Sequence, residues 1–425
     1  MSNTLLTISM ITQEALMVLK NELTFAAAVR RDYSDQFAID GAKIGDTVNV
    51  RRPGRFIGTS GAALNIEDLN ETSVPVVVGD TTQFGDQFHV DTQFTTKDMR
   101  LSMGPFSDRV IRPAVAAVAN RVDLIGLTMA KNTTANITGT PGTRPTGLLT
   151  YLNAGAYLDS EGAPRGANGR TVVIDQWTQT AIVDALKGLF VPDTQISTQY
   201  RKGMMGRDSG GMDWRMDQNV VNHTFGSWAS TAGALTVNGA SQGLATGWAR
   251  TSTISLTTTQ TLTLNQGDTL SFALCQAVNP QNRQAYGGGI NRTFCVQTTV
   301  TQTGAGNFNV TVAPALISGG QFQNVSASPA AGAAVTNTSL ATGTANAVVS
   351  PQNVLFHKNA YTLAMVDLPI PGGVDMSSRA TDPDAGLSIR VVRQYTINND
   401  ALPTRVDVLF GWAPLYQELG CRITA

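Results

Sequence analysis

Apolar residues recur at helical spacing near the N-terminus. Between residues 7 and 30 they advance in steps of three and four, while Glu14, Lys20 and Glu22 stay off that stripe. One face of a helix has this period. The pattern predicts an amphipathic helix whose apolar stripe consists of Ile8, Ile11, Ala15, Leu19, Leu23 and Ala26.

A longer apolar seam follows between residues 106 and 131. Its members are four, three, four, three and four positions apart: Ile111, Val115, Val118, Val122, Ile125 and Met129. This spacing predicts a long core helix lying on a sheet, since a coiled coil needs at least about three heptads. Ser107 or Asp108 can cap its start, and Pro113 is tolerated in a first turn.

A third helix is expected at 176–188, with Asp175 as its cap and Gly188 as its stop. Residues 132–170 precede it and are rich in Gly, Pro, Thr and Asn, which predicts a connection without regular structure.

Alternation with a period of two indicates strands elsewhere. "GDTVNVRRPGRF" and "TTQFGDQFHVDTQF" lie within residues 41–100 and predict an extended arm or hairpin with little core beneath it. "LSIRVVRQYTINNDALPTRVDVLFGWAPL", after Phe356, predicts two long strands around a tight turn. The arm predicted within residues 41–100 needs a partner to hold it, because it has little core of its own.

Between Asn222 and Phe356 lies a block rich in Thr, Val, Gly, Asn and Ser. Strand-like alternation runs through "TISLTTTQTLTLNQGD", "TFCVQTTVTQTGAG" and "NFNVTVAPAL", with turn signals between them. Many short strands separated by turns predict a β-barrel or sandwich. Leu270, Phe272 and Leu274 are expected on one face, toward its core.

Charge separates this block from the rest of the chain. Its only Asp, Glu, Lys or Arg residues are Arg250, Asp268, Arg283 and Arg292. The composition changes back after Phe356. We therefore expect residues 222–356, called the insert below, to interrupt a discontinuous outer domain made of residues 101–221 and 357–425.

Bulk composition limits the function. The chain has 425 residues, enough for two or three domains, and only 14% of them are charged against about 25% in typical soluble domains. Lys and Arg total 30 against 31 Asp and Glu, so no excess positive charge favours nucleic-acid binding as the main role. The low charge suggests a surface that is largely covered by something else.

Three widely spaced cysteines, Cys275, Cys295 and Cys421, fit neither a disulfide framework nor a zinc motif, and we expect reduced thiols. The N-terminal stretch does not have the pattern of a secretory signal, and no apolar run reaches the length of a membrane span, so no membrane association is expected.

Residue types that carry chemistry are few and scattered. The histidines are His89, His223 and His357, and the last two flank the insert, where they could meet. Two histidines without a carboxylate or thiolate partner are a weak metal site, so packing roles are favoured. Asp382 and Asp384 in "ATDPDAG" read first as a turn. With no hydrolase, P-loop or Rossmann motif, we expect no catalytic, cofactor or metal residues and no enzyme.

Four arginines are candidates for contacts between subunits. Arg51 and Arg52 lie in "VRRPGRF", a basic patch that is either a solvated face or an ion-pair partner for a neighbouring subunit. Arg283 and Arg292 are two of the four charges in the insert. For this second pair, exposed charges that only aid solubility are an equally good interpretation.

Several stretches carry a family resemblance. "QYRKGMMGRDSGGMDWRMDQNV", "GDTLSFALCQAVNPQ", "SASPAAGAAV", "LAMVDLPIPGGVD" and "GLSIRVVRQYTINND" resemble segments of the major capsid proteins of short-tailed double-stranded DNA phages. The resemblance covers nearly the whole chain in order and spacing. It implies an α+β Hong Kong 97-like capsid fold with an inserted all-β barrel, the I-domain.

By this resemblance, residues 1–40 are an N-terminal arm, 41–100 an extended E-loop region, 101–221 and 357–425 the capsid core, and 222–356 the I-domain. The resemblance implies that copies of the protein form hexamers and pentamers of an icosahedral shell. A scaffolding protein and a portal assist a procapsid that later expands around double-stranded DNA, without sequence-specific DNA binding. It places assembly in the host cytoplasm and the product in the virion capsid.

A β-rich tail-fibre or adhesin protein is the competing class. It would explain an uncharged block rich in Thr and Asn. It would not explain the long helix, the interrupted outer domain or the extended arm. The sequence therefore favours a self-assembling shell protein.

Overall fold

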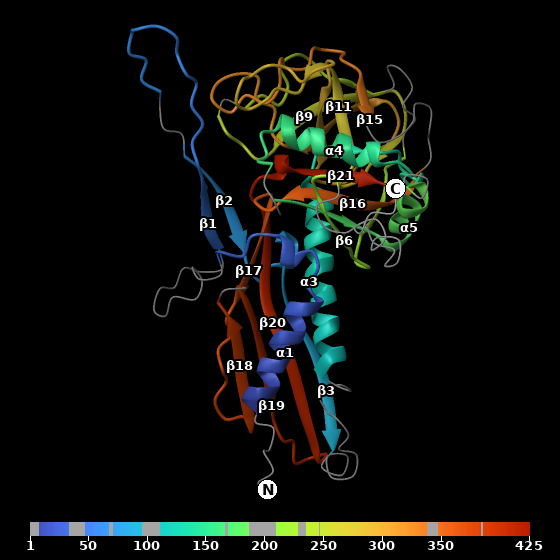
Figure 1. Ribbon diagram of the computed structural model, residues 1–425. Coiled ribbons are helices and arrows are strands. Elements are labelled where there is room, and N and C mark those ends of the chain that lie inside the picture. The colour runs from blue at the N-terminus through green and yellow to red at the C-terminus, as the bar shows by residue number, and fades with distance from the viewer. Residues whose placement is uncertain are drawn as a thin grey trace. The chain divides into compact units, whose positions relative to one another are not determined.

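A computed structural model gives the fold of the chain (Figure 1). It describes residues 8–33, 47–67, 71–95, 111–165, 169–186, 210–227, 235–245, 247–337, 347–383 and 386–425. The chain divides into two compact units, which are taken in turn. The first comprises residues 1–50, 74–129 and 361–413, and the second comprises 51–73, 130–360 and 414–425.

The first unit is built on a five-stranded sheet. Its members are β17 (Tyr361–Val366), β20 (Ala401–Pro414), β19 (Leu387–Arg393), β18 (Met376–Asp382) and β3 (Gly85–Thr95). β19 and β20 pair antiparallel around the predicted turn, which confirms that hairpin. β3 pairs with β20 along its whole length. The second alternating run of the predicted arm therefore belongs to this sheet, and its place in the arm was wrong.

Two predicted helices cover this sheet. α1 (Ile8–Glu22) buries Ala15 and Leu19 and packs against β18 and β19. In α3 (Arg112–Thr133), Arg121 pairs with Asp86 of β3 at 2.9 Å. Both helices are confirmed, and Pro113 falls in the first turn of α3, where its missing N–H costs nothing. The predicted caps Ser107 and Asp108 lie outside the described residues.

The second unit contains a different sheet, which has six strands. It contains β4 (Ile137–Thr138), β21 (Gly420–Thr424), β16 (Val349–His357), β5 (Arg170–Ile174) and β6 (Asp213–Met216), with β7 (Asn222–Thr224) also paired to β16. α5 (Gln176–Leu186) follows β5, and Asp175 accepts hydrogen bonds from the Trp177 and Thr178 amides, which confirms the predicted cap. Gly188 lies outside the described residues.

α4 (Leu148–Ser160) was missed, because the surrounding Gly, Pro and Thr residues led to the prediction of a connection. Its buried residues Tyr151, Ala154 and Leu158 are three and four positions apart, which is the helical period. They pack with the β5 and β21 side chains in one core.

Strands of the insert form a closed antiparallel sheet, called the barrel below. Its order is β15 (Val335–Asn337), β11 (Thr269–Gln276), β12 (Asn291–Val296), β14 (Gly306–Ala313), β9 (Ser252–Thr258) and β8 (Leu235–Val237). A bridge between Thr236 and Ala334 joins the two edges. The interior is apolar and includes Ile254, Leu256, Leu270, Phe272, Phe294 and Val310. β10 (Leu262–Leu264) and β13 (Val300–Gln302) form a separate pair.

The two ends of the insert pair with each other. Asn222–Thr224 of β7 lies antiparallel to Val349–Pro351 of β16, and we call these paired residues the neck. Further along, β16 pairs with β5 and β21. The predicted limit at Phe356 thus falls near the far end of a strand that also belongs to the second sheet.

One predicted side-chain direction in the barrel is wrong. Leu270 and Phe272 point into the core, but Leu274 is 82% exposed. The pairing of β11 with β12 shifts between Ser271 and Gln276, and Leu274 adopts a left-handed φ of 64°. A bulge of this kind turns a side chain out of the alternating pattern.

The arm is a two-stranded hairpin. β1 (Thr47–Arg52) pairs with β2 (Thr72–Val77), a partner that the sequence pattern did not predict. Between them the chain extends away from the strands (Figure 1), and large apolar side chains there are open to water: Phe56 is 63%, Leu64 87% and Ile66 81% exposed. The α+β class predicted from the sequence is confirmed.

Candidate functional site: the joints of the insert and the arm

The three histidines, which are far apart in the sequence, do not come together in the structure. His223 pairs with Ser350 and His357 with Arg170, seven residues apart along β16, so the two histidines do not meet. His89 lies between Arg405 and Asp91 on the other unit. In the described part of the chain, no three His, Cys, Asp or Glu residues are arranged to hold a metal ion, and no helix there could cross a membrane.

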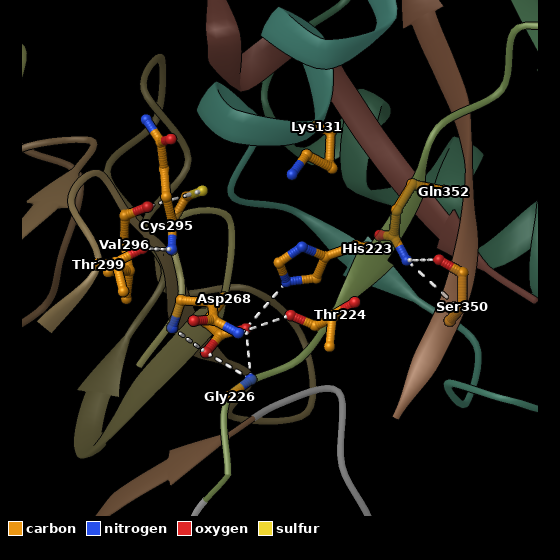
Figure 2. Close-up of polar contacts among 12 residues, drawn as sticks. Lys131, His223, Thr224, Gly226, Asp268, Cys295, Val296, Thr299, Ser350 and Gln352 are labelled. Atoms are coloured by element: carbon orange, nitrogen blue, oxygen red, sulfur yellow. Dashed lines mark hydrogen bonds and ion pairs between the residues drawn. The ribbon is translucent and has the colours of Figure 1, made fainter. Parts of the chain in front are cut away.

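Buried polar contacts join the insert to its surroundings at several places. The first joint lies beside the neck (Figure 2). His223 Nε2 is 2.9 Å from Asp268 Oδ1, and the two residues are 2% and 0% exposed. The Gly226 and Asn265 amides also donate to Asp268, at 3.0 and 2.8 Å from Oδ2. One carboxylate thus ties the strand entering the insert to the turn before β11.

This joint leaves no room for a side chain at Gly226. A Cβ there would lie 2.1 Å from the Thr263 carbonyl oxygen and 2.6 Å from Asp268 Oδ2. Gly267 has φ near 100° and faces the His223 ring, where a Cβ would come within 3.1 Å of Cε1. The two glycines let the backbone approach the histidine–aspartate pair closely.

Positive charges surround the pair. Burial lowers the pKa of His223 below its ordinary value of 6.5, against the opposing hydrogen bond to Asp268, and Arg422 and Lys131 add to the lowering. Figure 2 shows Lys131 beside the histidine ring. Burial also lowers the pKa of Lys131. The neutral imidazole therefore donates Nε2–H to the Asp268 carboxylate.

The end of α3 contacts the same region of the barrel. The Asn132 carbonyl oxygen accepts a hydrogen bond from the Cys295 thiol at 3.1 Å and another from Gln297 Nε2 at 3.1 Å. Burial raises the pKa of Cys295 to about 11. All three cysteines are free thiols, as predicted, and all three are buried.

A second joint clasps the end of α4. Asn279 Nδ2 donates to the Ser160 carbonyl at 2.7 Å, and Tyr286 Oη donates to Glu161 Oε1 at 2.6 Å. Arg292 forms an ion pair with the same Glu161 oxygen. Although burial acts against its charged form, the charge of Glu161 raises the pKa of Arg292. A buried pair of this kind fixes geometry, because neither partner has an alternative in water.

The third joint lies at the base of the arm. Arg52, the last residue of β1, forms an ion pair with Glu418, and Arg55 approaches the same carboxylate at 3.5 Å. The Arg52 guanidinium lies 4.4 Å from the centre of the Tyr416 ring and 5.3 Å from that of Trp248. Here the arm, the insert and residues 414–425, called the C-terminal segment below, come together.

The four candidate arginines fall into two groups. Arg52 and Arg292 are enclosed by partners of their own chain. Arg51 is exposed, and its guanidinium pairs with Glu71 within the arm at 3.1 Å, while Arg283 is partly exposed in a loop. Contact with neighbouring subunits stays a prediction, and Arg51 and the partly exposed Arg283 are better placed for it than the two enclosed arginines.

Sequence reasoning missed the partners Asp268, Glu161 and Glu418. A signal existed for the first, since Asp268 is the only acidic residue of the insert, and a lone acid in a block poor in charge is expected to have a specific partner. No comparable signal marks Glu161 or Glu418, whose partners are 131 and 366 positions away. The joints offer no nucleophile and base in contact, so their chemistry is positional.

Comparisons with known proteins were made for the whole chain. No curated protein sequence matches it. Solved structures with a similar trace include one from Mycobacterium phage Che8 (11% identity, TM-score 0.46, covering 94% of this chain and 90% of that chain) and the capsid of cyanophage P-SCSP1u (11%, 0.42, 91% and 85%). The capsid of Ralstonia phage GP4 is another (8%, 0.43, 92% and 84%).

The assignment rests on a family model instead. The model described as "P22 coat protein - gene protein 5" matches residues 1–424. A fibre or adhesin is not favoured by this match. The chain belongs to the P22 coat protein family and is a phage major capsid protein.

Proposed function

We propose that copies of this protein associate into the hexamers and pentamers of an icosahedral shell that encloses double-stranded DNA. The arm carries the proposal. Its exposed Phe56, Leu64 and Ile66 lie in the segment that connects the two strands of a hairpin, and an isolated hairpin is at best marginally stable in water. Several large apolar side chains exposed on one segment are typical of a contact surface, and another subunit is the partner that a capsid protein always has beside it.

The charge balance supports a container with little affinity for its contents. A net charge of −1 provides no excess of cations for neutralising phosphates, so the enclosed DNA is expected to be bound without sequence recognition. We also propose that a scaffolding protein and a portal take part, that assembly occurs in the host cytoplasm, and that the first shell matures by expansion. Membership of a phage coat protein family supports these proposals.

We further propose that the insert is a domain of its own within a discontinuous capsid core. The closed antiparallel sheet and its separate apolar interior support this division. The pairing of β16 with β5 and β21 supports a domain limit before Val349. The arm proposal is narrower than the predicted range 41–100, since β3 lies in another sheet.

Assembly tests the proposed function. Full-length protein, expressed with the scaffolding protein of its phage, is expected to sediment as closed shells seen by electron microscopy. The double variant Leu64→Ser/Ile66→Ser should stay unassembled, because it removes apolar area from the arm. Asn65→Ser is the matched control, since it changes a polar residue between the two, and it should assemble normally.

Two results would contradict the proposal. Wild-type protein that stays strictly monomeric, or that forms fibrous trimers, would exclude a shell protein of this kind. Normal shells from the Leu64→Ser/Ile66→Ser variant would show that the apolar arm is not the contact on which assembly depends.

A further inference from the structure

We infer that Arg52, Trp248, Tyr416 and Glu418 form a lock that fixes the direction in which the arm leaves its subunit, and that the insert holds one side of it. These four residues are called the arm lock below. The inference goes beyond shell formation, and it rests on the proposed function only where shells are the readout.

Arg52 is held on several sides at once. Its guanidinium pairs with Glu418 and lies 4.4 Å from the centre of the Tyr416 ring and 5.3 Å from that of Trp248. Only 10% of the Arg52 side chain is exposed. A planar guanidinium can stack on an aromatic face and bond a carboxylate at the same time, which the compact ammonium of lysine does not reproduce.

Each wall of the lock is anchored in a different part of the chain. Trp248 belongs to the insert and packs with Ala245 against the buried side chains of Ala315, Ile317 and Phe322. Glu418 lies in the C-terminal segment, where its carbonyl oxygen accepts a hydrogen bond from Asn136 Nδ2 at 3.1 Å. A shift of the insert would therefore move one wall of the lock against the other.

Electrostatics support a closed lock. Burial acts to raise the pKa of Glu418, but Arg52 and Arg55 more than offset it, so the pKa lies below its ordinary value. Arg51 provides the contrast one residue earlier. Its side chain is 79% exposed and pairs with Glu71 inside the arm, so it holds nothing outside the arm.

These contacts fix the base of the arm and therefore the direction in which the rest of the arm extends. Its apolar residues are the proposed contact with a neighbour. Arg52 holds the end of β1 against Trp248 of the insert and Glu418 of the C-terminal segment. Since arms that leave at different angles would place neighbours at different angles, the lock is expected to keep subunit contacts uniform.

Hydrogen exchange on the full, unassembled chain tests the lock directly. Trp248→Leu keeps an apolar group on the cluster but removes the ring, and Arg52→Lys keeps the charge but removes the planar fork. Each is expected to speed exchange of the β1 and β2 amides about two- to tenfold, the range of a partly desolvated cation–π contact. Combining the two should add little, because they break the same contact. Arg51→Lys is the control and should change nothing.

Unchanged exchange in both single variants, or fully additive effects in the double variant, would overturn the lock. Shells give a second readout: Trp248→Leu should produce particles of mixed diameter, and a diameter distribution like that of the wild type would overturn the role in arm direction. If the wild-type chain forms no shells at all, the proposed function fails, while the exchange measurement still decides the lock.

Discussion

The insert and the arm are attached to their surroundings in opposite ways. The insert is joined through buried charges, with Asp268 and Glu161 each satisfied by several donors. In the described part of the arm, Arg52 forms a buried ion pair with Glu418, while the neighbouring Arg51–Glu71 pair and the apolar side chains of the connecting segment are exposed. The insert is thus held by contacts within its own chain, whereas the apolar side chains of the arm are open to water and are proposed to be covered by another subunit.

This difference shows which contacts carry stability and which carry assembly. A buried carboxylate that loses its partner keeps the whole cost of its desolvation, so the joints of the insert should be sensitive to single substitutions. An exposed ion pair contributes little, and an exposed apolar side chain contributes nothing until it is covered. Changes in the arm should therefore leave folding intact and impair assembly.

Removal of Glu161 should cause the largest loss of stability. Glu161→Leu leaves Arg292 buried without its counter-ion, and we expect the free energy of unfolding to fall by about 3–5 kcal/mol. Urea denaturation followed by tryptophan fluorescence measures this. Arg51→Ala, which breaks the exposed pair of the arm, should cost less than about 1 kcal/mol.

A compensating variant sharpens that comparison. Glu161→Leu combined with Arg292→Met removes both charges, and it should recover most of the loss, since an apolar pair can replace a buried ion pair. If Glu161→Leu alone were as mild as Arg51→Ala, the contrast between insert and arm would have no energetic basis.

The neck should be the next most sensitive place. Gly226→Ala puts a methyl group 2.1 Å from the Thr263 carbonyl oxygen, so the backbone must shift, and we expect a loss of about 1–3 kcal/mol. Gly247→Ala is the matched control, because a Cβ there meets nothing within 4 Å. Thermal unfolding of the two variants should differ clearly, and equal melting temperatures would argue against a tight neck.

Acid should weaken the neck through His223. Its folded pKa lies below 6.5, so the unfolded chain binds a proton at a higher pH than the folded chain does. Stability is therefore complete above about pH 6.5 and falls as the pH drops through the folded pKa, by at most about 1.4 kcal/mol per pH unit for one proton. Urea midpoints between pH 4.5 and 6.5 measure the slope.

Two substitutions separate the histidines. The pKa of His357 is also lowered by burial, so both residues contribute in the same pH range. His223→Gln should remove its share of the slope while its amide still reaches Asp268, and His357→Gln should remove the rest. A slope that survives both substitutions must come from other groups.

Much of the fold was accessible from local patterns. α1, α3, α5, the β19–β20 hairpin and the barrel strands each repeat a period in consecutive residues, and a period does not depend on what lies far away. α4 was missed because its composition resembles that of a loop, although its apolar spacing is helical. The partners of β1 and β3 were missed because strand pairing is set by the tertiary fold.

The joints were almost inaccessible for the same reason. An arginine in sequence looks the same whether it ends in water or against a carboxylate more than a hundred residues away. Arg292 and Arg51 were assigned the same role, yet one is buried against Glu161 and the other is exposed. Only Asp268, the one acidic residue of a block poor in charge, carried a local hint of its partner.

Leu274 gives the smallest and most diagnostic effect, because the sequence pattern and the structure predict opposite signs. If the side chain filled the barrel core, as alternation suggests, Leu274→Gly would cost at least about 3 kcal/mol. In the structure it is exposed at φ 64°, which glycine adopts freely, so the same change should stabilise the chain by about 1 kcal/mol. The urea midpoint decides between them. A rise together with normal shells would make Leu274 an exposed position of the insert that assembly does not use, unlike the exposed residues of the arm.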